Sequence, residues 1–269
     1  MSVAPRSRFA LLAVAALVAA CSDSSTGPST PNVPDVASLI GEMSVSGIGS
    51  AVSVASPEVG LVFSASPTFA PANCVFTPST GYFVCPTITS NGLTFTRMFR
   101  LLDAANNPQS KPSEQTVAIE TKSTIMGTLT FNDRTSGTST VAIDRSDDMT
   151  LSGIQTTKHT LNGRAATKID GTMSTALGPI HVTTNQTELT TNIVLPNAKA
   201  GQRWPQSGSV QIDQTTSVTP NGQQSLTTIT RETITFNGTS VVTVTMVTGF
   251  GTLTCHFDLA NPATPSSCS

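Results

Sequence analysis

The sequence predicts an all-β protein: an antiparallel up-and-down meander that forms a curled sheet, a half-barrel or a barrel, with one short N-terminal helix. Beyond about residue 90, apolar residues alternate with Thr and Ser at a period of two, which is typical of half-buried strands. Glycine-containing turn signals separate these runs, and connections this short force neighbouring strands to run antiparallel. Only one stretch of the chain has helical spacing.

The first 20 residues are typical of an export signal. Arg6 and Arg8 precede an apolar run of 12 residues, which is too short to span a bilayer as a helix. The run ends in small residues before a lone cysteine, in the order Val18-Ala19-Ala20-Cys21. This stretch resembles the lipobox of bacterial lipoproteins, a likeness that is confined to the signal region.

The lipobox resemblance implies cleavage before Cys21, a diacylglycerol on its sulfur and an acylated new N-terminus. Two or three acyl chains would anchor the protein stably, where one chain binds only marginally. Ser22 after the cysteine implies a cell-envelope location at the outer membrane, in a cell that has one. The alternative is an ordinary secretory signal that is cleaved after Ala15.

Residues 21–35 are rich in Ser, Thr, Pro and Gly and are predicted to be a flexible tether. Asp35 is the expected N-cap of a short amphipathic helix over 36–43, which would cover an open end or edge of the sheet. The helical spacing is that of Val36, Leu39, Ile40 and Met43. Residues 36–269 are predicted to form a single β domain.

Four cysteines remain after Cys21, an even number in an exported chain, so two disulfides are expected. They are Cys74, Cys85, Cys255 and Cys268. Segment 74–85, CVFTPSTGYFVC, is nearly a mirror image about its centre, so a hairpin places its two cysteines opposite each other. The other two then pair by default. A zinc site is the alternative, but no Cys-x-x-Cys spacing supports it.

Two features of the expected strands concern the interior of the sheet. Turns are predicted at Asn91-Gly92, Asn162-Gly163, Asn221-Gly222 and Asn237-Gly238, with weaker signals at Ser136-Gly137 and Thr248-Gly249. Segments 183–188 and 214–217 are polar on both faces, which predicts a thin core. A membrane-spanning barrel would want aromatic girdles, and one Tyr, one Trp and 11 Phe make that alternative poor.

The familiar catalytic motifs are absent, so no catalytic residue, metal ligand or cofactor is predicted. The three histidines, His159, His181 and His256, are scattered over distant hairpins and are expected to face solvent. Asp144, Asp147 and Asp148 form the only acidic cluster. It lacks the glycine that shapes a calcium loop and contains Arg145, so we expect a solvated bend or bulge.

Arg203 and Trp204 are the predicted ligand contacts, because a loop Trp beside an Arg is able to stack on a ligand. The alternative is that the sole Trp closes one end of the β core. After loss of the signal, 12 basic and 16 acidic side chains remain, a net charge near −4. This weak, mixed charge argues against a nucleic-acid partner.

The sequence therefore favours a membrane-anchored envelope lipoprotein with a non-catalytic binding or structural role; it indicates no protein partner. One alternative is a carrier of a lipid or other apolar molecule. Its cavity would be lined by Phe95, Phe99, Ile119, Ile125 and Phe131. Another alternative is a hydrolase whose site lies on a loop such as 196–206.

The lipid anchor is testable by mass. We expect the intact exported protein to carry acyl chains on Cys21, and Cys21→Ala to release the protein from membranes in unlipidated form. Intact mass spectrometry of both forms measures this. An exported wild-type protein with an unmodified Cys21 sulfur would contradict the prediction.

Overall fold

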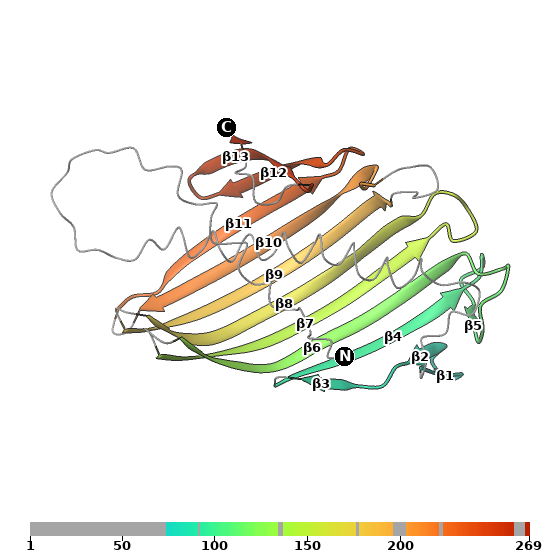
Figure 1. Cartoon of the computed structure of the whole chain (residues 1–269), viewed down its shortest axis with the longest axis horizontal. Helices are drawn as coiled ribbons and strands as arrows, with labels where there is room; N and C mark the ends of the chain where they lie inside the picture. Colours follow the sequence, from blue (N-terminus) through green and yellow to red (C-terminus); the bar gives the residue numbers. More distant parts are fainter. Residues whose placement is uncertain are drawn as a thin grey trace, which may run out of the picture.

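The chain forms one antiparallel sheet whose strands follow one another in sequence order (Figure 1). The computed structural model describes residues 74–90, 92–133, 137–175, 178–195, 203–220, 223–260 and 267–269. Among these residues the main path of the sheet runs β1-β2-β4 and then β6 through β14, while β3 and β5 pair with β4. The first and last strands lie at opposite edges, which confirms the all-β curled meander and shows that it does not close into a barrel.

Long strands make up the middle of the sheet and short strands its edges. The long strands are β4 (Leu93–Leu102), β6 (Ala118–Asp133), β7 (Gly137–Ser152), β8 (Thr160–Thr175), β9 (Gly178–Val194), β10 (Ser207–Pro220) and β11 (Leu226–Thr235). The others are β1 (Val75–Thr77), β2 (Tyr82–Val84), β3 (Ile88–Ser90), β5 (Pro108–Gln109), β12 (Val241–Thr248), β13 (Gly251–Asp258) and β14 (Ser267–Cys268).

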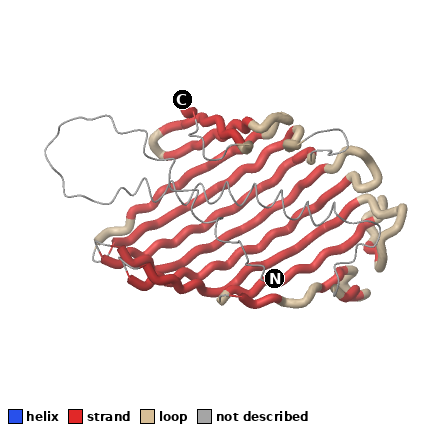
Figure 2. Tube along the Cα trace, viewed as in Figure 1, coloured by secondary structure: helices blue, strands red, loops and turns tan. Residues whose placement is uncertain are grey.

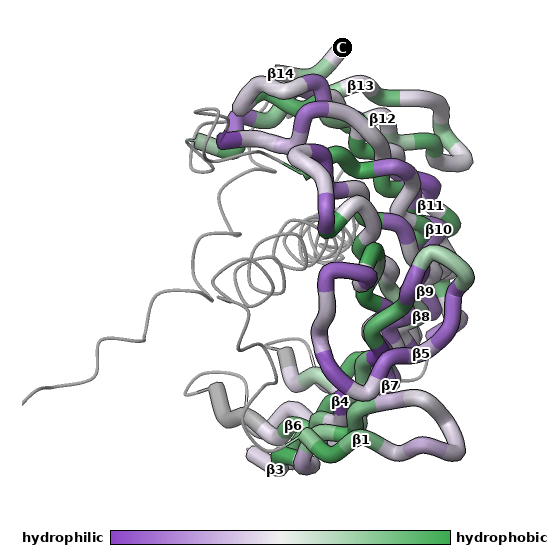
Figure 3. Tube along the Cα trace, turned by 90° about the vertical axis from the view of Figure 1, so that its right-hand side faces the viewer, coloured by the Kyte–Doolittle hydropathy of each residue, from purple (hydrophilic) through white to green (hydrophobic). Residues whose placement is uncertain are grey.

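The described loops lie mostly at the ends of the strands (Figure 2). Seen from the side, the sheet is an arc whose two edges bend toward the same side (Figure 3). The described part of the chain contains no apolar helix of membrane-spanning length. The helix expected over 36–43, the tether and the signal segment all lie outside the described residues.

The cross-strand register sorts side chains onto two faces. On the face that we call the buried face, the apolar and polar side chains of β10 at Val210, Ile212, Gln214, Thr216 and Val218 are at most 5% exposed. We call the opposite face the open face; on β9 it carries exposed side chains such as Asn185 and Leu189. Because paired residues share a face, each face is a set of rows that cross the sheet.

The buried face holds three separate apolar clusters. The largest gathers residues of β7 through β12 around Ile234, and the second joins Phe83, Phe99 and Ile119. A third, small cluster lies around Val182 and Val218. Polar side chains, including Thr184, Glu188, Gln214 and Thr216, are buried on the same face, as expected for the thin core that segments 183–188 and 214–217 predict.

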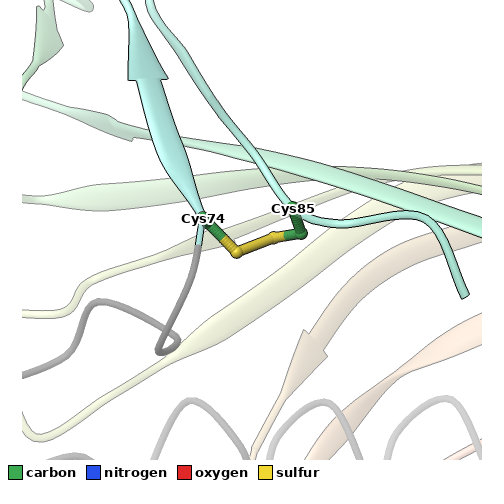
Figure 4. Close-up of a disulfide and its surroundings, with 2 residues drawn as sticks. All are labelled: Cys74 and Cys85. Atoms are coloured by element: carbon green, nitrogen blue, oxygen red, sulfur yellow. A yellow bond between two sulfur atoms is a disulfide. The ribbon is translucent and has the colours of Figure 1, made fainter.

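The N-terminal hairpin has the register that its mirrored sequence predicts. Val75 pairs with Val84 and Phe76 with Phe83, and a disulfide joins Cys74 to Cys85 (Figure 4). The rings of Phe76, Phe83 and Phe99 stack in succession across β1, β2 and β4, with centroids 5.0 and 4.8 Å apart. Cys255 and Cys268 form the second disulfide, between β13 and β14.

Two expectations were wrong. Asn162-Gly163 is not a turn but lies inside β8, where a Cβ on Gly163 would come 2.4 Å from Met149 Sδ. This glycine leaves room for a neighbour's side chain. The acidic cluster is not a bend, because β7 runs without a break through it, placing Asp144 and Asp148 on the open face and Asp147 on the buried face. Asn221-Gly222 lies outside the described residues.

The C-terminal disulfide is expected to contribute to stability by closing a loop with a sequence separation of 13 residues. Replacing Cys255 and Cys268 together with Ser should lower the free energy of unfolding by about 2–3 kcal/mol, as for loops of this length. Urea unfolding of both proteins measures the difference. A peptide map without reduction that joins Cys74 to Cys255 would contradict the pairing itself.

Candidate functional site

The open face carries a polar hollow of about 440 Å³ at the middle of the sheet. It crosses five adjacent strands, from β7 to β11. Its lining residues are Asp144, Ser146, Ala166, Thr167, Lys168, Asn185, Gln186, Thr187, Asp213, Gln214, Thr215 and Ile229. Its volume lies within the range of small-molecule sites.

Short side chains aligned by the register form the floor of the hollow. Ser146 pairs with Ala166, and Ala166 pairs with Thr187, so three small side chains lie in one row across β7, β8 and β9. Longer side chains occupy the rows on either side. One row carries Asp144, Lys168 and Asn185, and the other carries Asp148, Arg164 and Leu189. A depression follows because the middle row is shorter than both neighbouring rows.

Three polar side chains on one wall of the hollow are uncommitted. Asp144 and Lys168 face each other across β7 and β8, and Asn185 is the next residue in the row. Within the described ranges, none of the three makes a side-chain hydrogen bond or ion pair, and all three are exposed. Together they offer a carboxylate acceptor, an ammonium donor and an amide that both donates and accepts.

Asp213 forms a charged rim on the other side of the floor. Its carboxylate accepts hydrogen bonds from Arg231 Nε at 2.5 Å and from Gln211 Nε2 at 2.8 Å. The hydrogen bond from Arg231 lowers the pKa of Asp213 below its ordinary value, so this group stays ionised at neutral pH. Ile229, 67% exposed, adds an aliphatic edge beside these charges.

A second polar cluster on the open face has its charges already paired. Glu120 accepts hydrogen bonds from Tyr82 and from Arg100, and Lys122 bridges it to Asp148 at 3.6 and 3.5 Å. Burial acts to raise the pKa of Glu120, but the hydrogen bonds from Tyr82 and Arg100 outweigh it, and the net pKa is lowered. This cluster therefore anchors β2 to the sheet and offers little to a ligand.

The buried face contains an ion cluster between its apolar clusters. Arg145 contacts Asp147 at 2.6 Å and Glu188 at 3.6 Å, with side chains that are 11%, 11% and 3% exposed. It reaches from β7 to β9 because the intervening residue of β8 is the small Ala165. Burial raises the pKa of Glu188, and the positive charge of Arg145 offsets this only in part.

The predicted ligand contacts do not line the hollow. Arg203 is exposed in the segment before β10, and Trp204 is half-buried beside it, with its carbonyl accepting a hydrogen bond from Gln206 Nε2 at 2.6 Å. Contact of these two residues with a ligand remains a prediction. The structure brings other residues together instead.

The histidines do not converge on one another. Burial lowers the pKa of His159, which lies just before β8. His181 Nε2 lies 3.5 Å from Asp170 Oδ1, with both side chains about half exposed and neither among the lining of the hollow. His256 lies beside Thr243 on β13. Within the described ranges, no group of three His, Cys, Asp or Glu side chains is placed to hold a metal.

Sequence reasoning missed most of the hollow. It singled out Asp144, but it gave no role to Lys168, Asn185 or Ala166. The available signal was weak: segment 183–188 is polar on both faces, and a strand that buries neither face is a candidate for binding. The alignment with β7 and β8 depends on the register, which the sequence does not print.

Comparisons of the chain with protein-family models, with curated proteins and with solved structures give no match. The chemistry of the hollow must therefore be argued from the residues of this chain. Its features are a short floor, an uncommitted polar row and a charged rim.

The raised pKa of Glu188 predicts a pH-dependent effect on stability. An ionised Glu188 costs folding free energy at neutral pH, and this cost disappears as the pH falls through the pKa of the folded state. Glu188→Gln should therefore be more stable relative to wild type at pH 7 than at pH 4. Urea unfolding at both pH values measures this, with Glu114→Gln in an exposed loop as the control. A difference that is larger at pH 4 would contradict it.

Proposed function

We propose that this protein is a lipid-anchored, non-catalytic binding protein of the cell envelope, and that the hollow binds a hydroxyl-rich ligand such as a short saccharide. The observation that carries this proposal is the uncommitted row of Asp144, Lys168 and Asn185 above a floor of short side chains. The export signal and the lipobox-like sequence at Cys21 support the envelope location.

The mixture of groups in the hollow favours hydroxyls over a single charge. A hydroxyl both donates and accepts, so it satisfies Asp144 as a donor and Lys168 as an acceptor at the same time. Carboxylate and ammonium partners give charge-assisted hydrogen bonds, which are stronger than neutral ones. Ile229 offers an apolar surface to the C–H groups of a sugar ring.

The lipid-carrier alternative needs a continuous apolar lining on the buried face. Phe99 and Ile119 do lie in one apolar cluster, but the ion cluster of Arg145, Asp147 and Glu188 occupies the middle of the face. A long acyl chain laid along this face would have to desolvate these charges, which is costly. This arrangement speaks against a carrier.

The hydrolase alternative lacks a supporting arrangement. A general base must lie within hydrogen-bond reach of its partner in a site that also holds the substrate. Of the described histidines, His181 is close to a carboxylate, but the pair is half exposed and lies outside the lining of the hollow. We therefore propose binding without catalysis.

Filling the floor tests the proposed site. Ala166→Phe places a ring over the short row, so we expect it to weaken saccharide binding at least about tenfold, since several hydrogen bonds would be lost. Thr172→Phe adds the same ring to an exposed position of β8 outside the hollow and should leave binding unchanged. The measurement uses the Cys21→Ala protein on an array of mono- to tetrasaccharides, followed by titration of the best binder.

Two outcomes would overturn the proposal. Binding to none of the arrayed saccharides would reject the ligand class. Equal binding by the Ala166→Phe and Thr172→Phe variants would place any saccharide site elsewhere on the protein. Circular dichroism of both variants checks that the β-sheet is retained.

A further inference from the structure

The hairpin of β12 and β13 has an unusual composition. Residues 241–254 contain no ionisable side chain, in a chain that carries 30 charged residues among 269. At its turn, Phe250 lies between Gly249 and Gly251 and is 100% exposed. An isolated exposed apolar residue needs no explanation, but a fully exposed phenylalanine at the tip of an uncharged hairpin does.

Other apolar side chains surround this tip. Val247 is 43% exposed and Leu253 is 41% exposed, and they lie three residues before and after Phe250. Ile229 on the adjacent strand β11 is 67% exposed, close to where Thr230 pairs with Thr248 at the end of β12. The tip and its flanks therefore present four exposed apolar side chains on three neighbouring strands.

The polar backbone of the turn is satisfied locally. The Phe250 N–H donates to Thr248 Oγ1 at 3.1 Å, and the Thr248 hydroxyl donates to the Gly251 carbonyl at 3.3 Å. Local hydrogen bonds of this kind lower the cost of moving a turn out of water. The apolar tip is thus able to leave water with less loss than an ordinary polar turn.

We propose that the β12–β13 tip inserts into the interfacial layer of a lipid bilayer, with Phe250 as its leading side chain. Interfacial segments bury Phe and Leu side chains at the boundary between headgroups and acyl chains. A bilayer fits better than a protein because 14 residues without an ionisable group give a partner no charge to recognise. The proposal does not rest on the saccharide hollow, which lies on β7 to β11.

Vesicle binding by the unlipidated protein tests the proposal, because the acyl anchor would otherwise hide the effect. The Cys21→Ala protein is sedimented with vesicles of phosphatidylethanolamine and phosphatidylglycerol, and with vesicles of phosphatidylcholine. We expect Phe250→Ser to lower the partition coefficient at least about tenfold on both. Ile88→Ser is the matched control, since Ile88 is 60% exposed at the opposite edge of the sheet.

A fluorescence measurement gives a second readout. In the Cys21→Ala background, replacing Trp204 with Phe and Phe250 with Trp leaves a single indole at the tip, whose emission should shift to the blue on addition of vesicles. No vesicle binding, or equal binding by the Phe250→Ser and Ile88→Ser variants, would overturn the proposal. A dimer in sedimentation that Phe250→Ser dissociates would also overturn it, by assigning the tip to a second copy of the chain.

Discussion

The register of the long antiparallel strands is the constraint on which the rest of the structure depends. A shift of one residue in any pairing would exchange the two faces of a strand, because side chains alternate with a period of two. The apolar clusters oppose such a shift. Ile212 and Ile234 are at most 2% exposed on the buried face, and a slip would carry them to the open face.

The same constraint creates the hollow. Ser146, Ala166 and Thr187 are about 20 residues apart in sequence and become neighbours only through the register. The open face separates charges that are paired, as around Glu120, from charges that have no partner within the described residues, as at Lys168. This separation matters because only the second kind is available for a ligand without first breaking an existing contact.

Much of the fold followed from the sequence, whereas little of the site did. The hairpin of residues 74–85 was predictable because its symmetric sequence fixes its own register, and strand alternation identified the buried face. Asn162-Gly163 misled because a glycine that makes room for Met149 looks in sequence like a glycine in a turn. The hollow escaped because its residues come from different hairpins, and each loop length would have to be known to align them.

The ends of the sheet have a consequence for crowding on a surface. β1 offers three residues and β14 only two, and each is stapled to its neighbour by a disulfide. Strand margins this brief give an adjacent molecule too few free amide and carbonyl groups to continue the ladder. Many copies are therefore able to stand close together without polymerising edge to edge into fibres.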